Sequence, residues 1–99
     1  MTEQEIFNAF PVGEANALTR HELAELFGLS ERELRAVIDR LRRSGAIICA
    51  CGKGYFRPAV RREVEAYIMR EERRAANVLE SIKAAKRAAR SGVRSSDTR

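Results

Sequence analysis

The 99-residue chain has no tryptophan, and its only aromatic residues are four phenylalanines and two tyrosines. So few aromatic residues in so short a chain do not favour a large aromatic pocket. The single histidine, His21, has no serine, cysteine or acid placed beside it by a known motif, so nucleophilic catalysis has no support. We expect a protein that is not an enzyme, with no cofactor and no small-molecule substrate.

Cysteine is also scarce, with only Cys49 and Cys51. These residues are two apart in a predicted strand, so their side chains point to the same face and would make a strained disulfide. Together with His21 they number three ligands, too few for a closed structural zinc site. We therefore expect two reduced thiols and no metal.

Long apolar runs are absent, because no stretch approaches the roughly 18–20 residues that span a bilayer. The N-terminal sequence MTEQEIFNAF is acidic and has neither a basic start nor a small-residue cleavage site. These features predict a cytoplasmic protein with no membrane partner.

Charge is abundant, and it is unevenly distributed. Residues 1–50 carry six arginines and eight acids, whereas residues 51–99 carry thirteen Lys/Arg and six acids, and the whole chain has a net charge of +5. A basic balance favours polyanions such as nucleic acid or an anionic surface.

The pattern along the chain predicts three short helices. Residues 2–10 form the first, which ends at Pro11-Val12-Gly13, and a linker at 13–17 follows. Capping boxes start the second helix at Thr19 and the third at Ser30, and Gly28 ends the second. The third helix runs to Ser44-Gly45, and its apolar stripe comprises Leu34, Val37, Ile38 and Leu41.

A hairpin and a long helix complete the prediction. The β-branched, apolar segment 46–51 reads as a strand, Gly52-Lys53-Gly54 as a turn, and 55–57 as the return strand. No Gly or Pro interrupts the helical pattern from about residue 59 to residue 90. The predicted fold is mainly α with a small β-hairpin, divided into a domain at 1–58, a basic helix at 59–90 and a flexible tail at 91–99.

The order of three helices and a hairpin resembles the winged helix-turn-helix superfamily of DNA-binding proteins, over roughly residues 1–58. The local match consists of apolar, small and turn residues at the expected positions: Leu23, Ala24, Phe27, Gly28, Leu29, Leu34 and Val37. Ala24 lets two helices cross closely, and Gly28 permits the sharp turn. Small stand-alone modules of this kind also resemble those of prophages.

The resemblance implies that helix 30–43 enters the major groove of duplex DNA and that the hairpin at 46–57, the wing, meets the backbone or minor groove. The outward positions of the helix are Ser30, Arg32, Arg35, Ala36, Asp39 and Arg43. Arg32 and Arg35 suit guanine, and the small Ala36 allows close approach or contact with a thymine methyl. In the helix, phosphate contacts are assigned to Arg40, Arg42 and Arg43. In the wing, they are assigned to Lys53 and Arg57, and Tyr55 lies beside these two residues.

Acids on or near this helix oppose that interpretation. Glu31 and Glu33 can be explained as first-turn acids that favour the helix dipole and complete the cap. Asp39 can pair with Arg35 or Arg43, one turn away.

The long helix carries an apolar stripe with a period near 3.5 residues: Val64, Ile68, Ala75, Val78, Ile82, Ala85 and Ala89, interrupted by Glu71. This pattern is typical of a coiled coil and predicts a homodimer. In another interpretation, Val60, Val64, Tyr67 and Ile68 fold back on the domain and the rest is a charged surface. The basic segment 83–90 can follow phosphates, dock an acidic partner or be solvated.

The function predicted is sequence-specific binding of duplex DNA, with transcriptional regulation as its purpose. The alternative is a docking module that uses helix 60–90 on a protein partner without binding DNA.

Overall fold

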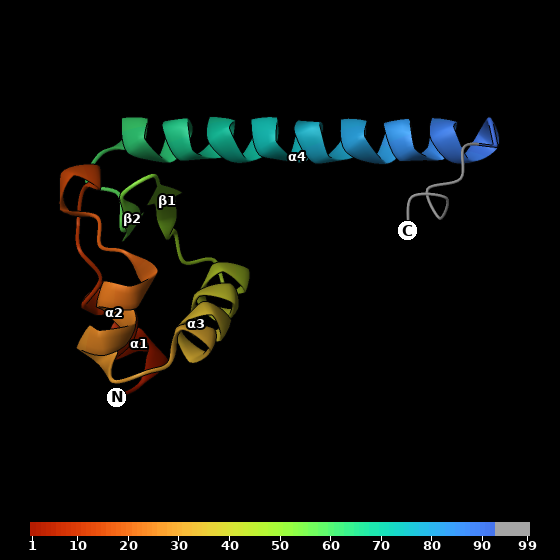
Figure 1. Cartoon of the computed structure of the whole chain (residues 1–99). Coiled ribbons are helices and arrows are strands. Elements are labelled where there is room, and N and C mark those ends of the chain that lie inside the picture. Colours follow the sequence, from red (N-terminus) through yellow and green to blue (C-terminus); the bar gives the residue numbers. More distant parts are fainter. Residues whose placement is uncertain (93–99) are drawn as a thin grey trace. The chain divides into compact units, whose positions relative to one another are not determined.

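The computed structural model describes residues 1–92. It contains two compact units, Met1–Tyr67 and a second that begins at Ile68. The elements are α1 (Glu3–Asn8), the 3₁₀ turn η1 (Glu14–Asn16), α2 (Arg20–Phe27), α3 (Glu31–Arg43), β1 (Cys49–Cys51), β2 (Gly54–Phe56) and α4 (Arg61–Arg90) (Figure 1). The prediction of a mainly helical fold with a small antiparallel hairpin and a long C-terminal helix is confirmed. Of the predicted tail, residues 93–99 lie outside the described residues.

Capping boxes begin α2 and α3, as the sequence predicted. The Thr19 N–H donates to Glu22 Oε1 at 2.8 Å, and the Glu22 N–H donates back to Thr19 Oγ1 at 3.1 Å. The same reciprocal pair joins Ser30 and Glu33, at 2.9 and 3.0 Å. These bonds occupy backbone N–H groups that the first turn of a helix otherwise leaves without partners.

The turn between α2 and α3 depends on Gly28. Its φ of +67° lies in the left-handed region, where a side chain is unfavourable. The next residue, Leu29, donates its N–H to the Ala24 carbonyl at 2.9 Å, which closes the end of α2. The two helices are therefore joined by a short, fixed connection.

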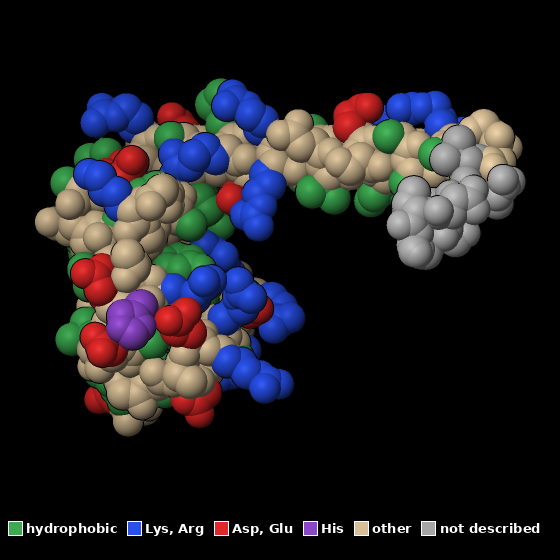
Figure 2. All heavy atoms as spheres, viewed as in Figure 1, with side chains coloured by type: hydrophobic (Ala, Val, Ile, Leu, Met, Phe, Trp, Pro, Cys, Tyr) green, Lys and Arg blue, Asp and Glu red, His purple; other side chains and the backbone are tan. Residues whose placement is uncertain are grey.

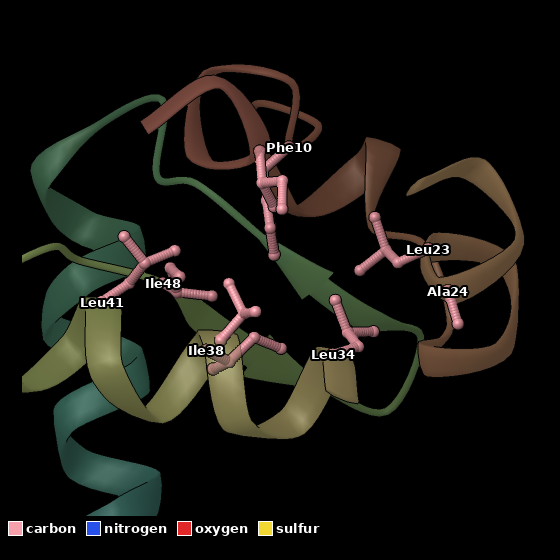
Figure 3. Close-up of a cluster of buried hydrophobic side chains, with 9 residues drawn as sticks. Phe10, Leu23, Ala24, Leu34, Ile38, Leu41 and Ile48 are labelled. Carbon is pink, nitrogen blue, oxygen red and sulfur yellow. The ribbon is translucent and has the colours of Figure 1, made fainter. Parts of the chain in front are cut away.

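The core of the first unit lies between α1, α2, α3 and the hairpin. Figure 3 shows Leu34, Ile38 and Leu41 directed from α3 toward side chains of the other elements. The buried cluster comprises Ile6, Phe10, Leu23, Ala24, Leu34, Val37, Ile38, Leu41 and Ile48. All four predicted stripe residues of α3 belong to it, so this face of α3 is fixed inward.

The hairpin is shorter than predicted. β1 begins at Cys49 rather than at residue 46, because the Ala46 N–H donates to the Leu41 carbonyl at 2.9 Å and so belongs to the end of α3. β2 ends at Phe56, and Arg57 pairs with a different segment: its N–H donates to the Pro11 carbonyl at 2.7 Å, and its carbonyl accepts from Gly13 at 2.8 Å. Cys49 is buried and Cys51 half-buried, and the two cysteines are not joined in a disulfide.

The segment predicted to be a linker is ordered. Residues 14–16 form η1, and Leu18 and Tyr55 exchange two backbone hydrogen bonds, at 3.1 and 2.8 Å. Gly54 makes this approach possible, because a Cβ on it would collide with the Leu18 carbonyl and its φ is +132°. The hairpin is therefore held against residues 12–18 as well as by its own pairing.

The first unit also includes the start of α4, because it extends to Tyr67. The carboxylate of Glu63 accepts hydrogen bonds from the Glu14 N–H at 2.9 Å and from the Ala59 N–H at 2.8 Å. The bond from Glu14 connects the first turn of α4 to η1, and the bond from Ala59 joins it to the residues just before the helix.

Candidate nucleic-acid interface

The outer face of α3 carries the predicted contact residues, and all of them are exposed: Ser30, Arg32, Arg35, Ala36, Asp39, Arg40 and Arg43. They are exposed because the apolar stripe of α3 is buried in the core. The helical period then turns the residues between the stripe positions toward solvent. Figure 2 shows Lys and Arg side chains gathered over α3. Ser30 has a structural role in addition, because its hydroxyl accepts the Glu33 N–H in the helix cap.

Arg32 and Arg35 lie along a surface hollow of about 280 Å³, together with Arg20 and Glu31. Neither Arg32 nor Arg35 has an ion pair or side-chain hydrogen bond within residues 1–92. Their guanidinium groups therefore keep all their N–H donors for a ligand. Arg20 was not among the predicted site residues, because it opens a different helix and only the packing of α2 on α3 brings it here.

The acids of the first turn of α3 are engaged in internal bonds. Arg20 Nε donates to Glu31 Oε1 at 3.1 Å, and His21 Nδ1 lies 3.3 Å from Glu31 Oε2. Hydrogen bonds from Arg20 and then from His21 hold the pKa of Glu31 below its ordinary value. Glu33 completes the cap at Ser30. Glu33 thus completes the cap as the sequence predicted, whereas Glu31 is bonded to Arg20 and His21 of α2, which was not predicted.

Asp39 differs from the expectation. It is exposed, and no ion pair with Arg35 or Arg43 is formed among the residues that the structure describes. Its negative charge therefore remains on the outer face of α3, where it repels a phosphate and can accept a hydrogen bond from a cytosine amino group.

The three arginines at the end of α3 have different surroundings. Arg40 pairs with Glu3 of α1, with 2.6 Å between its Nη2 and Glu3 Oε2. Arg42 donates from Nε and Nη2 to the Ile48 carbonyl, at 3.1 and 2.7 Å, and its guanidinium carbon lies 5.9 and 5.5 Å from the ring centroids of Tyr55 and Tyr67. Its Nε and Nη2 donors are therefore engaged inside the fold, and the assignment of Arg42 to phosphate stays a prediction that this arrangement does not favour.

Arg43, in contrast, is exposed and has no internal partner within the described part of the chain. It remains available to a phosphate, as predicted.

The hairpin supplies fewer contacts than predicted. Lys53 is exposed at the turn and has no internal ion pair within residues 1–92, but Tyr55 is half-buried against the core. Arg57 faces inward: its Nη2 donates to the Asn8 carbonyl at 3.0 Å, and its guanidinium lies 5.1 Å from the Phe7 ring centroid. Arg57 therefore has a structural role, and its predicted contact with phosphate stays a prediction that this orientation does not favour.

In the second unit, apolar side chains of α4 are exposed. Of the predicted dimer residues, Val78 is 53% exposed, Ile82 45% and Ile68 46%, and Ala75 is exposed as well. Leu79 is 56% exposed and extends this surface, although the period of 3.5 residues did not include it. Val64, which belongs to the first unit, is half-buried.

No known family model, curated protein or solved structure matches the chain. None of the helices between residues 1 and 92 is long and apolar enough to cross a membrane. Nor do the described His, Cys, Asp and Glu side chains form any group of three or more that could hold a metal ion.

Proposed function

We propose that the chain is a winged helix-turn-helix protein of the cytoplasm that binds duplex DNA sequence-specifically and regulates transcription. In this proposal the outer face of α3 contacts bases in the major groove, and Lys53 in the hairpin contacts the backbone. The protein acts as a homodimer, paired through α4.

One observation carries the proposal. Arg32, Arg35 and Arg43 stand on the exposed face of α3 without internal partners in the described chain, while the nearby acids Glu31 and Glu33 are bound to other groups. An arginine with free donors can form a bidentate contact with guanine, and each such contact contributes about 1–3 kcal/mol of discrimination. Asp39 is an acid of this face without an internal ion pair among the described residues, so one unpaired carboxylate stands beside three unpaired arginines and positive charge predominates on the face.

The test is a fluorescence anisotropy titration of a random pool of duplex DNA, followed by selection of the preferred sequence. We expect salt-dependent binding to the pool, and we expect Arg32→Ala/Arg35→Ala to lose most of the preference for the selected site. A matched control, Arg62→Ala/Arg73→Ala, removes the same charge from exposed positions of α4. Equal losses in the two variants would show that only net charge matters, and no binding to any duplex at low salt would refute the proposal.

A second candidate is supported by the exposed apolar side chains of α4. Val78, Leu79 and Ile82 form a surface that fits a partner helix, so a docking module that never meets DNA is the alternative. The docking module would be favoured if the chain bound a protein partner, if Ile82→Asp abolished that binding, and if no DNA binding were found.

A further inference from the structure

The second unit of the chain contains an apolar stripe on α4 between Glu71 and Ala89. Its most exposed large residues are Val78, Leu79 and Ile82, at 53%, 56% and 45%. A shallow hollow of about 480 Å³ runs along the stripe and is lined by Glu71, Arg74, Ala75, Val78 and Leu79. Figure 2 shows hydrophobic side chains on the surface of this helix. Such a surface lowers its free energy when a second apolar surface covers it.

The heptad pattern determines which residues meet if a second copy covers the stripe. Ala75, Ile82 and Ala89 occupy the a positions, and Glu71, Val78 and Ala85 occupy the d positions. The flanking e positions are Glu72, Leu79 and Lys86. In a parallel pair each core residue faces its own copy, whereas in an antiparallel pair a faces d and e faces e.

A parallel pair brings like charges together. Glu71 faces Glu71 of the second copy within the core, so two carboxylates are desolvated side by side. The flanking Lys86 faces Ser81, which offers no opposite charge. A parallel pair therefore has an electrostatic penalty and forms no ion pair between the two copies at these positions, and the charge is offset only within each helix, by Arg74 at 3.7 Å from Glu71.

An antiparallel pair centred near residue 80 removes this conflict. Ile82 of each copy then packs on Val78 of the other, and Leu79 packs on Leu79 across the two-fold axis. Glu72 lies opposite Lys86 of the second copy, and the symmetry forms this ion pair twice. Glu71 lies opposite the small Ala89 near the basic Arg90, outside the central apolar layers.

We infer that residues 71–89 of α4 pair antiparallel with the same segment of a second copy, with Glu72 facing Lys86 of that copy. The inference rests on the proposed homodimer and specifies its direction and register. A register centred half a heptad earlier is disfavoured, because it packs Ile82 against Glu71 and moves the Glu71–Arg74 ion pair into an apolar layer, where desolvation of the two charges is costly.

Charge reversal in the full-length protein tests the inference by sedimentation equilibrium at low salt. Lys86→Glu places two glutamates opposite each other at both ends of the pair, and we expect the dimer dissociation constant to rise roughly tenfold. Glu72→Lys has the same effect. The double variant, Glu72→Lys/Lys86→Glu, restores opposite charges and should return the constant to within about threefold of the wild-type value.

Arg87→Glu is the matched control, because it makes the same change of charge one residue away, at an f position that faces out of the pair. It should leave the dissociation constant nearly unchanged. The antiparallel arrangement is overturned if the double variant fails to restore the dimer, or if Arg87→Glu weakens the dimer as much as Lys86→Glu does. The homodimer itself stands in both cases. A wild-type protein that remains monomeric at high concentration overturns the homodimer and its arrangement together.

Discussion

Arg42 and Arg43 are neighbours in α3, but their side chains have different surroundings. The Arg42 guanidinium donates two hydrogen bonds to the Ile48 carbonyl and lies 5.9 and 5.5 Å from the ring centroids of Tyr55 and Tyr67, whereas Arg43 is exposed and has no internal partner in residues 1–92. The first arrangement stabilises the fold, and the second leaves the charge available to a ligand. Sequence alone gave both residues the same role.

Alanine substitutions should separate the two roles. Arg42→Ala removes two hydrogen bonds to a buried carbonyl and a cation–π contact, so we expect it to lower the free energy of unfolding by about 1–3 kcal/mol. Arg43→Ala should change it by less than about 0.5 kcal/mol and should weaken binding to all duplex sequences, because it removes a phosphate contact. Urea denaturation and anisotropy titrations measure the two effects, and equal losses of stability would contradict the structural role of Arg42.

At the scale of the element, four glutamates stabilise helix starts or the contact between α2 and α3. Backbone and side-chain hydrogen bonds from Thr2 and Thr19 lower the pKa of Glu5 and Glu22. Arg20 and His21 lower the pKa of Glu31, and the N–H groups of Glu14 and Ala59 lower the pKa of Glu63. The folded protein therefore holds these four carboxylates in the ionised form.

The lowered pKa values give the stability a pH dependence of defined sign. A carboxyl group whose pKa is lower in the folded state stabilises the fold at pH values above the unfolded-state pKa, and the effect is lost as the pH falls through the folded-state pKa. We expect the free energy of unfolding to decrease with acidification below the ordinary glutamate pKa of about 4.3. Glu22→Gln/Glu63→Gln keeps oxygen acceptors that do not titrate, so it should flatten the profile in urea denaturation series. A variant that follows the wild-type profile would assign the acid sensitivity to other groups.

Local signals predicted most of the elements, and the long-range contacts account for the differences. The boxes at Thr19 and Ser30 and the glycine after α2 depend on residues within four positions, so the bounds of α2 and α3 followed from sequence. The pairing of Arg57 with residues 11–13 and of Leu18 with Tyr55 joins segments far apart in the chain. No local pattern encodes these bridges, and for that reason the linker was misjudged. The first strand was predicted too long for another reason, because Ala46 is bonded to Leu41 at the end of α3.

In the candidate site, too, local patterns predicted some features and long-range contacts determined the others. The exposure of Arg32, Arg35 and Arg43 could be predicted from the period of α3, because the apolar stripe fixes the opposite face. The inward orientation of Arg57 could not, since it depends on the Asn8 carbonyl and the Phe7 ring, which α1 brings to it. The contribution of Arg20 was missed for a similar reason, and the resemblance to winged helix-turn-helix proteins stays a prediction.

At the scale of the whole molecule, the proposed homodimer should couple two DNA-binding units. Ile82→Glu introduces a carboxylate into the centre of the apolar stripe of α4, so we expect the dimer dissociation constant to rise more than tenfold. Affinity for a duplex with two inverted half-sites should fall with it, while affinity for one half-site should persist. Sedimentation equilibrium and anisotropy titrations with both duplexes measure these effects.

Met69→Glu is the control for this prediction, because Met69 is 60% exposed and occupies a position off the stripe. It should leave both the dimer and the binding of paired half-sites intact. Loss of binding to a single half-site in Ile82→Glu would indicate damage to the DNA-binding unit rather than to dimerisation.

The division among the arginines of α3 has a consequence for how such a protein can diverge. Arg42 is tied to the fold through the Ile48 carbonyl, so replacing it changes the scaffold, whereas Arg40 forms a surface ion pair with Glu3 that contributes at most about 1 kcal/mol. Arg32, Arg35 and Arg43 have no internal partner in residues 1–92, so substitutions there cost little stability. Under the proposed function, descendants of this sequence can therefore acquire new specificity one surface residue at a time, and the inherited scaffold tolerates each intermediate.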